Sequence, residues 1–401
     1  MDGSLQMCWT GNFSVITALL LVLLVSCNRG SGDSTERNTG GKSAGNLTGR
    51  LEKLAWQEMG VAIDAGPPML DLVTFLPGNL DSDSADELLL LWDHYRIYDL
   101  DGVYVNSNLI GYDNKAVDCL WDSDGDGVSE YVVVRYELIR NAASGRLLSE
   151  MSVVDLSGHA IMEFEGKPLL SRNLVDIDGN GSRELLVAIP DAEGVGNTVN
   201  AIDGSGNSLW NEPDLHSISV PAVGDVDGDG REEVLGISRQ ALASNAPNSR
   251  VFGMEQDPVQ IAELQDAEHW GNAVYCADMD GDGKAEILTN QLKVLSLAGP
   301  VMELERPADW TAQFIVFDIG SEYSELEIDG QFALAALVGE SVSDMEKDTV
   351  LIWDAQGRIV YRRTFKQPMR HLFVVSDGSQ PVLILQGVDG QLRRAELPVV
   401  D

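Results

Sequence analysis

A nine-residue pattern, Asp-x-Asp-x-Asp-Gly-x-x-Glu, returns along the chain and limits what the chain can fold into. Near-complete copies end at Glu130, Glu184, Glu233 and Glu286, and a degraded copy ends at Glu87. Consecutive glutamates lie about 50 residues apart, and repeats of this length each form one supersecondary unit. The chain is therefore expected to consist of repeated units that bury their apolar faces against one another.

The pattern supplies oxygen atoms at positions that suit a hard metal ion. Side chains at positions 1, 3 and 5 converge when the loop curls, and glycine at position 6 adopts a positive φ without strain. Position 7 can add a backbone carbonyl, and position 9 adds a carboxylate. Because Ca²⁺ prefers six to eight oxygen ligands in a flexible cage, the pattern indicates calcium binding. A single copy could be an acidic surface turn, but repeated copies that each precede an apolar run disfavour that interpretation.

Other calcium-binding repeats fit this sequence less well. An EF-hand needs an acidic residue at position 12 of its loop and a helix after the loop. The four near-complete copies instead carry Val133, Val187, Gly236 and Thr289 at that position, and β-type runs follow position 9. Nonapeptide β-helix repeats would recur every nine residues, which these copies do not.

The loop pattern resembles the FG-GAP/VCBS family, the integrin-α-type repeat, over roughly residues 68–390. This resemblance implies a β-propeller that holds calcium in the loop between the first two strands of a blade. In the degraded copy Asn79 occupies position 1 and Ser84 replaces the glycine, so four calcium sites are expected and a fifth is in doubt. The metal ligands that the resemblance implies are Asn79, Asp81, Asp83, Glu87, Asp122, Asp124, Asp126, Glu130, Asp176, Asp178, Asn180, Glu184, Asp225, Asp227, Asp229, Glu233, Asp278, Asp280, Asp282 and Glu286.

Each repeat unit is predicted to have four strands, A to D, with the acidic loop between A and B and a glycine-containing turn between C and D. In the fifth unit these strands are expected at 273–277, 286–289, 292–297 and 301–305. Degraded loops at 318–325 and 376–378 mark a sixth and a seventh unit. We therefore predict an all-β fold, a seven-bladed β-propeller of four-stranded blades over residues 51–401, although six or eight blades would also close a ring.

The seventh unit is one strand short before the chain ends, and a missing outer strand would leave an exposed edge. Residues 49–58 resemble the D strand at 206–212, with glycine, leucine, tryptophan and glutamate in the same order. We therefore predict that residues near Leu51 to Gln57 pair as the outer strand of the last blade and join the two chain ends. The alternative is a short helix that links the N-terminal segment to the propeller.

The charge balance excludes several classes of protein. With 27 Lys and Arg against 64 Asp and Glu, the formal net charge is −37, which argues against binding to nucleic acid. Hydrophobic residues make up 44% of the chain, so disorder throughout is excluded. The 4 cysteines are too few for a disulfide framework, and we interpret Cys119 and Cys276 as small core residues of A strands.

The N-terminus is predicted to be a targeting segment that is not part of the folded domain. Residues 15–25 form an apolar run of signal-peptide length that is too short to span a bilayer. The run ends in Leu24-Val25-Ser26-Cys27, which resembles a bacterial lipobox and implies lipidation of Cys27. We expect a lipoprotein-type signal peptide at 1–26, a flexible tether at 27–50, export, and anchoring to a membrane of the cell envelope or cell surface. An ordinary cleaved signal peptide and a buried helix are the alternatives.

Alternating strand direction places the acidic loops and the C–D turns on one face, and the B–C and D–A loops on the other. Aromatic residues and histidines collect in the latter loops, where they could form a platform for a glycan or protein ligand. In the alternative interpretation the tryptophans pack between blades and the histidines have no common role. The candidate ligand-face residues are Trp92, His94, Tyr95, Arg96, His216, His269, Trp270, Trp310 and His371.

Catalysis has little support in the sequence. Metal binding accounts for the carboxylate pairs, and the chain has no Gly-x-Ser-x-Gly, His-Glu-x-x-His or phosphate-binding glycine loop. The expected function is a calcium-binding, envelope-anchored module for binding, adhesion or scaffolding, without enzyme activity. A carbohydrate-active enzyme of the polysaccharide-lyase type on a calcium propeller is the alternative.

Overall fold

In the computed structural model the described part of the chain begins at Leu47, four residues before the expected start of the propeller. Within the described residues, no helix is long and apolar enough to cross a membrane. The described residues are 47–60, 74–81, 83, 85–91, 95–100, 104–108, 115–138, 147–164, 170–190, 197–212, 215–216, 222–238, 249–254, 259–260, 273–289, 292–310, 323–328, 331–339, 347–378 and 381–397.

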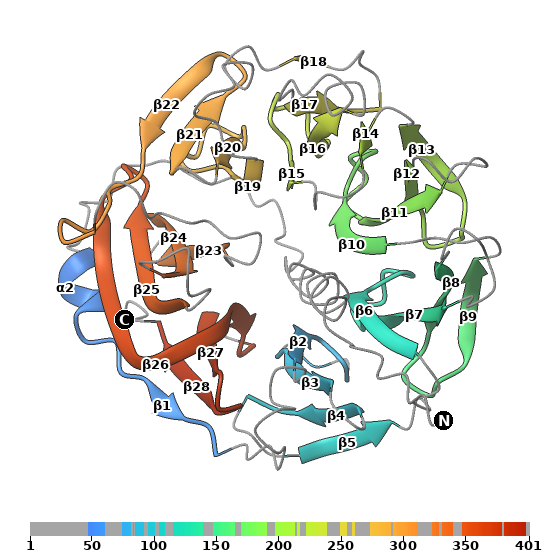
Figure 1. The fold of residues 1–401 in the computed structure, drawn as a ribbon, viewed down its shortest axis with the longest axis horizontal. Coiled ribbons are helices and arrows are strands. Elements are labelled where there is room, and N and C mark those ends of the chain that lie inside the picture. The colour runs from blue at the N-terminus through green and yellow to red at the C-terminus, as the bar shows by residue number, and fades with distance from the viewer. Residues whose placement is uncertain are drawn as a thin grey trace, which may run out of the picture.

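The described strands form six antiparallel sheets that are arranged as a ring (Figure 1). The first three sheets contain one repeat unit each, with four strands in chain order. The first unit comprises β2 (Thr74–Gly78), β3 (Glu87–Leu91), β4 (Tyr95–Tyr98) and β5 (Tyr104–Asn108). The second comprises β6 (Lys115–Trp121), β7 (Glu130–Leu138), β8 (Leu147–Val154) and β9 (Ala160–Phe164). The third comprises β10 (Leu170–Val175), β11 (Glu184–Pro190), β12 (Asn197–Ile202) and β13 (Ser208–Glu212).

The fourth and fifth sheets each contain one further unit. The fourth comprises β14 (Leu215–His216), β15 (Ala222–Gly224), β16 (Glu233–Ser238), β17 (Ser249–Phe252) and β18 (Val259–Gln260). Two short strands, β14 and β15, both pair with β16 in place of one first strand. The fifth comprises β19 (Ala273–Ala277), β20 (Glu286–Thr289), β21 (Lys293–Ser296) and β22 (Gly299–Glu303). The predicted bounds of its first two strands are confirmed, and the other two lie within two residues of the prediction.

The last sheet contradicts the predicted count of seven separate blades, because the strands that the structure describes form six sheets. This sheet has seven strands and combines the predicted sixth and seventh units. It comprises β23 (Tyr323–Ile328), β24 (Gln331–Val338), β25 (Lys347–Asp354), β26 (Ile359–Ser376), β27 (Pro381–Gly387), β28 (Leu392–Glu396) and β1 (Gln57–Glu58).

One long strand, β26, joins the two predicted units into this single sheet. Its first half pairs with β25, as in Thr349↔Thr364, and its second half pairs with β27, as in Phe373↔Ile384. The register with β25 shifts between Thr364 and Met369, an interval that contains Pro368, and the register with β27 shifts between Met369 and His371. Proline cannot donate a ladder hydrogen bond. Residues 366–370 contain no glycine, so the chain continues extended where two separate blades would need a connecting turn.

The hydrophobic core lies between neighbouring units. Leu76 and Leu89 of the first unit, for example, pack with Val117 and Tyr131 of the second, and the other adjacent pairs form equivalent clusters. Fully burying one such side chain contributes about 1.5–3 kcal/mol. Two buried tryptophans also bond across these boundaries: Trp121 Nε1 donates to Arg183 O at 2.7 Å and Trp353 Nε1 donates to Glu305 O at 2.8 Å. Cys119 and Cys276 are core residues with 0% exposure, as predicted.

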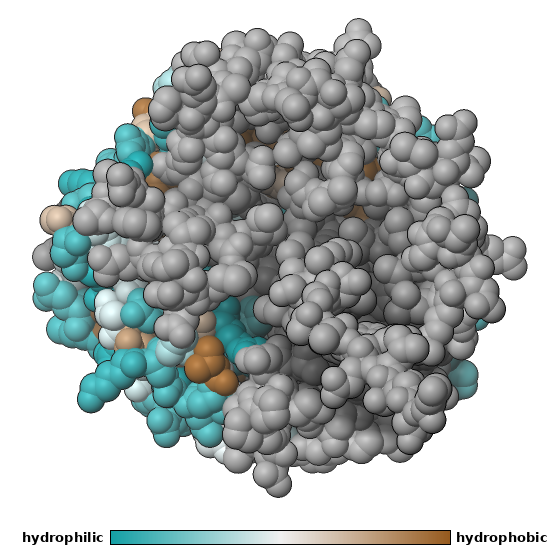
Figure 2. All heavy atoms as spheres, in the orientation of Figure 1, coloured by the Kyte–Doolittle hydropathy of each residue, from teal (hydrophilic) through white to brown (hydrophobic). Residues whose placement is uncertain are grey.

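The N-terminal segment closes the ring, and both alternatives from the sequence occur in it. Leu47–Leu51 form a short helix, α2, whereas β1 pairs antiparallel with β28 through Gln57↔Arg394 and Glu58↔Arg393. The predicted pairing is therefore confirmed at Gln57 and wrong for residues 51–56, the first of which belongs to the helix. Along the part of the rim near α2, β1 and β26, the described atoms are mostly hydrophilic (Figure 2).

Contacts between the first and last sheets complete the closure. Ala85 and Asp377 form a β-bridge, and Arg394 Nη1 donates to Leu100 O at 3.0 Å. Met59 packs in a cluster that contains residues of both sheets. The two ends of the described chain thus meet in one continuous ring (Figure 1).

Candidate metal centres

The five acidic loops connect the first and second strands of the first five units, as the sequence predicts. We number these loops in chain order, from the first at 79–87 to the fifth at 278–286. In the fourth loop Asp225 Oδ1 accepts the N–H groups of Gly228 and Asp229 at 2.7 and 3.1 Å, and Oδ2 accepts that of Gly230 at 2.9 Å. Asp122 of the second loop accepts amides from the same three positions, and Asp176 and Asp278 of the third and fifth loops each accept two of them, including that of the position-6 glycine. The first aspartate therefore closes each of these loops.

The side chains at positions 3 and 5 each accept the N–H group two residues further along. In the fourth loop Asp227 Oδ1 accepts from Asp229 at 3.1 Å, and Asp229 Oδ1 accepts from Arg231 at 2.9 Å. All five loops make both bonds. The alternating spacing of the pattern thus produces the same local geometry every time, because each bond spans only three residues.

Glycine at position 6 has a positive φ in the second to fifth loops, which confirms its predicted role. The angles are 89° at Gly127, 87° at Gly181, 88° at Gly230 and 89° at Gly283. Sequence analysis overlooked a second glycine at position 4, which also has a positive φ in these four loops. Its signal, Asp-Gly-Asp-Gly or Asp-Gly-Asn-Gly, is visible in the sequence.

The glutamate at position 9 begins the second strand and lies under the loop. In each loop Oε2 of this glutamate accepts the N–H group at position 2. The donors are Leu80, Ser123, Ile177, Val226 and Met279, at 2.7, 2.9, 3.0, 2.9 and 2.9 Å from Glu87, Glu130, Glu184, Glu233 and Glu286. All five glutamates are buried, so each loop carries one carboxylate that is shielded from water.

Burial is the main cause of a raised pKa at these glutamates, and the neighbouring aspartate charges add to it. The pKa of Glu87, Glu184 and Glu286 is raised to about 7, and that of Glu233 to about 8. Burial also raises the pKa of Glu130. A bound cation would oppose both causes, since it stabilises the ionised form of every carboxylate around it.

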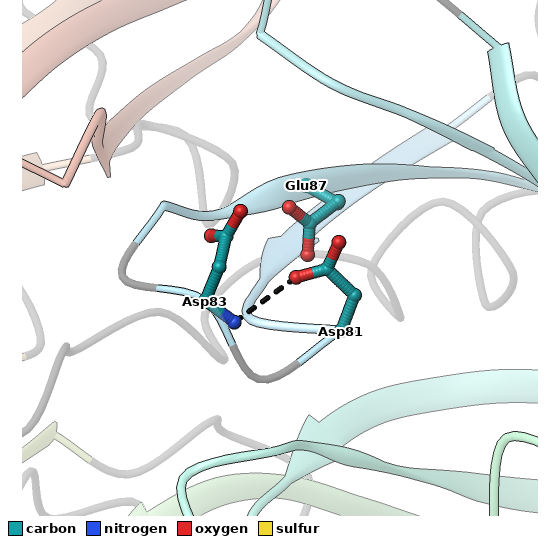
Figure 3. A group of neighbouring side chains, drawn as sticks. All are labelled: Asp81, Asp83 and Glu87. Carbon is teal, nitrogen blue, oxygen red and sulfur yellow. Dashed lines mark hydrogen bonds between the residues drawn. The ribbon is translucent and has the colours of Figure 1, made fainter.

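Three carboxylates converge in every loop, with one oxygen from each within 4.8 Å of the others. Figure 3 shows this arrangement in the first loop, where Asp83 N donates to Asp81 Oδ1 at 3.1 Å. The first three groups are Asp81, Asp83 and Glu87; Asp122, Asp124 and Glu130; and Asp176, Asp178 and Glu184. The other two are Asp225, Asp227 and Asp229, and Asp278, Asp280 and Asp282. Among the predicted carboxylate ligands, Asp126, Glu233 and Glu286 lie outside these groups.

The donor set fits calcium. Oxygens that bind one Ca²⁺ at about 2.4 Å can lie no more than about 4.8 Å apart, and the carboxylate oxygens of each group meet that limit. All the side-chain donors are oxygens, and Asn79 and Asn180 add amide oxygens to the first and third loops. The first loop converges like the others, although its sequence is the most degraded.

The C–D turns contain a second repeated feature that sequence analysis missed. In the third unit Asp203 Oδ1 accepts the N–H groups of Ser205 and Asn207 at 2.9 and 2.7 Å. Asp155 and Asp354 accept the corresponding amides in two other turns. Their signal is an aspartate three residues before the turn glycine, a residue type that commonly bonds to its own backbone in turns.

One C–D turn lies directly against an acidic loop, as the prediction of a shared face requires. A methyl group added at Gly204, in the turn of the third unit, would overlap the carbonyl oxygen of Ser123 in the second loop. The charge of Asp203 in the same turn also contributes to the raised pKa of Glu184. This turn therefore belongs to the surroundings of two candidate metal centres.

The structure describes few of the predicted ligand-face residues. Trp310 is half-buried against the core cluster of the fifth unit and lies 5.8 Å from the Arg362 guanidinium, which favours the packing interpretation. His371 lies on β26 with its ring stacked 5.8 Å from Phe373. Trp92, His94, His269 and Trp270 lie outside the described residues, and Tyr95, Arg96 and His216 are described only as members of β4 and β14. Cys27 also lies outside the described residues.

Comparisons with known proteins support the fold and identify no family. No family model and no curated protein matches the chain, so the FG-GAP/VCBS resemblance stays a prediction. Two crystal structures of BBS1N in complex with ARL6DN, soaked with mercury and with lead, match 86% of this chain at 13% identity. They are covered over 97% and 98% of their length, with TM-scores of 0.52 and 0.51. BamB from Moraxella catarrhalis matches 81% of this chain and 83% of its own at 14% identity, with a TM-score of 0.38. The first two likenesses show a propeller fold and say nothing of function.

Proposed function

We propose that this protein is a calcium-stabilised β-propeller that serves as a non-catalytic binding or scaffold module. One observation carries this proposal: five loops that share the hydrogen bonds at positions 3, 5 and 9 each bring three carboxylate oxygens within 4.8 Å of one another. Ionised carboxylates at this distance repel one another, so five such clusters at equivalent points of a ring indicate a shared role. Bound calcium would neutralise the charges of these carboxylates.

Calcium in these loops would stabilise the fold and take no part in a reaction. In the first three loops each ion would tie the start of a second strand, through its glutamate, to the loop before it. Binding to the folded protein alone adds about 2.7 kcal/mol per site at a free calcium concentration one hundred times Kd. Several such sites would contribute as much as the whole stability of a small domain, about 5–15 kcal/mol.

Calcium analysis tests the proposal directly. Protein stripped with EDTA should melt at a lower temperature, regain its stability in calcium, and regain little in magnesium, which demands a stricter octahedral geometry. Metal analysis should find about four to five calcium ions per chain, one per acidic loop. An unchanged melting curve in EDTA, for protein shown to contain no residual metal, would refute the proposal.

The ligand of the module is proposed to bind the face opposite the acidic loops. A protein ligand has support from the solved structures, since BBS1N is seen in complex with ARL6DN. The aromatic residues Trp92 and Trp270 leave a glycan as the alternative. An array of glycans and matrix proteins, probed with and without EDTA, would separate the two. No binding to any protein or glycan would refute the assignment of this face.

The module is further proposed to be held at the cell envelope by a lipid on Cys27. The apolar run that ends at this cysteine supports the proposal. Metabolic labelling with a clickable fatty acid should mark the wild-type protein and leave Cys27→Ser unmarked. Labelling of both proteins, or of neither, would refute the anchor without affecting the calcium proposal.

A further inference from the structure

Neighbouring units are joined by a repeated backbone hydrogen bond between their loops. The N–H group at position 8 of one loop donates to the carbonyl oxygen of the position-1 residue in the preceding unit. The four bonds are Ser129 N to Asn79 O at 2.8 Å, Glu232 N to Asp176 O at 2.8 Å, Ala285 N to Asp225 O at 2.6 Å, and Asp86 N to Ser376 O at 2.8 Å. In the first, third and fourth loops, the residue that offers the first ligand is therefore held by the following unit.

Glu232 adds a side-chain clamp to this contact. Its Oε2 accepts the N–H group of Asp176 at 3.0 Å, so Glu232 binds both backbone polar groups of that residue. Its Oε1 accepts Nη2 of Arg183 at 2.9 Å, which fixes the glutamate itself. The Glu232 side chain is only 15% exposed. Since Asp176 is position 1 of the third loop, a residue of the fourth unit sets the backbone from which this carboxylate enters its cluster.

The same clamp occurs at the junction between the last and first sheets, where it holds no candidate ligand. Asp86 Oδ2 accepts the N–H group of Ser376 at 2.6 Å, while Asp86 N donates to Ser376 O. Like Glu232, Asp86 occupies position 8 and directly precedes the buried glutamate of its own loop. Ser376, however, is the serine of a degraded loop. Glu232 and Asp86 thus make the same pair of hydrogen bonds, but only the residue held by Glu232 belongs to a candidate metal centre.

We propose that Glu232 is a positioning residue for metal binding in the third loop. A residue of the fourth unit thereby increases the calcium affinity of a metal centre in the third unit. The inference rests on the proposed calcium binding and adds a coupling between adjacent units. Groups that orient metal ligands without touching the metal typically change affinity by about 10–100-fold when removed. We therefore expect Glu232→Ala to weaken calcium binding at the third loop by about tenfold or more.

The test compares three variants with the wild-type protein by calcium titration and by hydrogen exchange of residues 170–190, with melting in EDTA as the measure of structural damage. Glu232→Ala should lose most of the calcium-dependent protection of this segment. Glu232→Gln keeps an oxygen acceptor for the Asp176 amide and should retain it. Asp86→Ala removes the matched clamp and should leave calcium protection of 170–190 unchanged. If Glu232→Ala does not fold, Glu232→Asp shortens the clamp more gently and should give the same effect in smaller measure.

A double variant checks that Glu232 acts through the third loop. Adding Glu232→Ala to Asp178→Ala, which already removes a ligand of that loop, should cause no further loss of bound calcium. Full calcium protection of 170–190 in Glu232→Ala, or the same loss in Asp86→Ala, would overturn the inference. A wild-type protein that binds no calcium would instead refute the proposed function, and the two failures are therefore distinct.

Discussion

Deleting residues 47–59, which we call the N-terminal clasp, should open the ring at its last sheet. The clasp contributes α2, whose Leu47 and Leu51 are buried in the core of that sheet, and β1, which covers the edge of β28. Between them Trp56 Nε1 donates to Tyr361 OH at 2.9 Å. A chain that starts at Gly60 lacks all of these contacts, whereas one that starts at Gly45 keeps them.

The size of the effect follows from the burial of single residues. Leu51 is 0% exposed, and truncation of such a leucine to alanine costs about 2–5 kcal/mol. At about 2 °C per kcal/mol for a large domain, Leu51→Ala alone should lower the melting temperature by roughly 4–10 °C. The deletion also removes the buried side chains of Leu47, Leu54 and Met59, so its cost should exceed that of Leu51→Ala. It therefore approaches the whole stability of an ordinary domain, about 5–15 kcal/mol.

Thermal unfolding followed by circular dichroism and light scattering measures the prediction. The chain from Gly60 should melt well below the Leu51→Ala variant, or aggregate through the exposed edge of β28. The chain from Gly45 is the control and should melt like the full-length protein. If the chains from Gly45 and Gly60 melt within about 2 °C of each other, the clasp does not close the ring and the reasoning from burial is wrong.

Three further predictions concern the loops and turns. In calcium-free protein, burial raises the pKa of Glu233 to about 8 from an ordinary 4.5. The contribution of this group to stability is therefore complete below about pH 4.5 and is lost as the pH rises through 8. Melting in EDTA should occur at a higher temperature at pH 5 than at pH 8, and the opposite order would contradict this. Asp227→Ala should lose more bound calcium than Asp83→Ala, because the first loop departs most from the pattern, and equal losses by metal analysis would place the first loop on a par with the others. Gly204→Ala should destabilise the protein by about 1–3 kcal/mol through overlap with the Ser123 carbonyl. A melting temperature equal to that of the wild-type protein would show that the turn can shift.

The acidic loops were predictable because everything that shapes them lies within nine residues. Asp225 closes on amides three to five positions away, and Asp227 and Asp229 bond two positions away, so the order of residues alone determines these turns. The apolar runs on either side of the loops predicted the first two strands of the fifth unit to the residue for the same reason. The hydrogen bonds that recur in the loops join residues close in the sequence, so a short sequence pattern is enough to predict them.

Contacts between units could not be predicted in this way. Glu232 is one of many acidic residues in the sequence, and only packing of the fourth unit on the third brings its carboxylate to Asp176, 56 positions earlier. The single sheet around β26 also depends on distant contacts, because the strands that pair with β26 on each side determine whether it continues or turns. The sequence by itself determined the repeat, the loop geometry and the all-β class of the chain. The tertiary structure decided how many sheets the units form, that β1 completes the last of them, and which residue of one unit holds the loop of the next, since these depend on hydrogen bonds and burial between segments far apart in the chain.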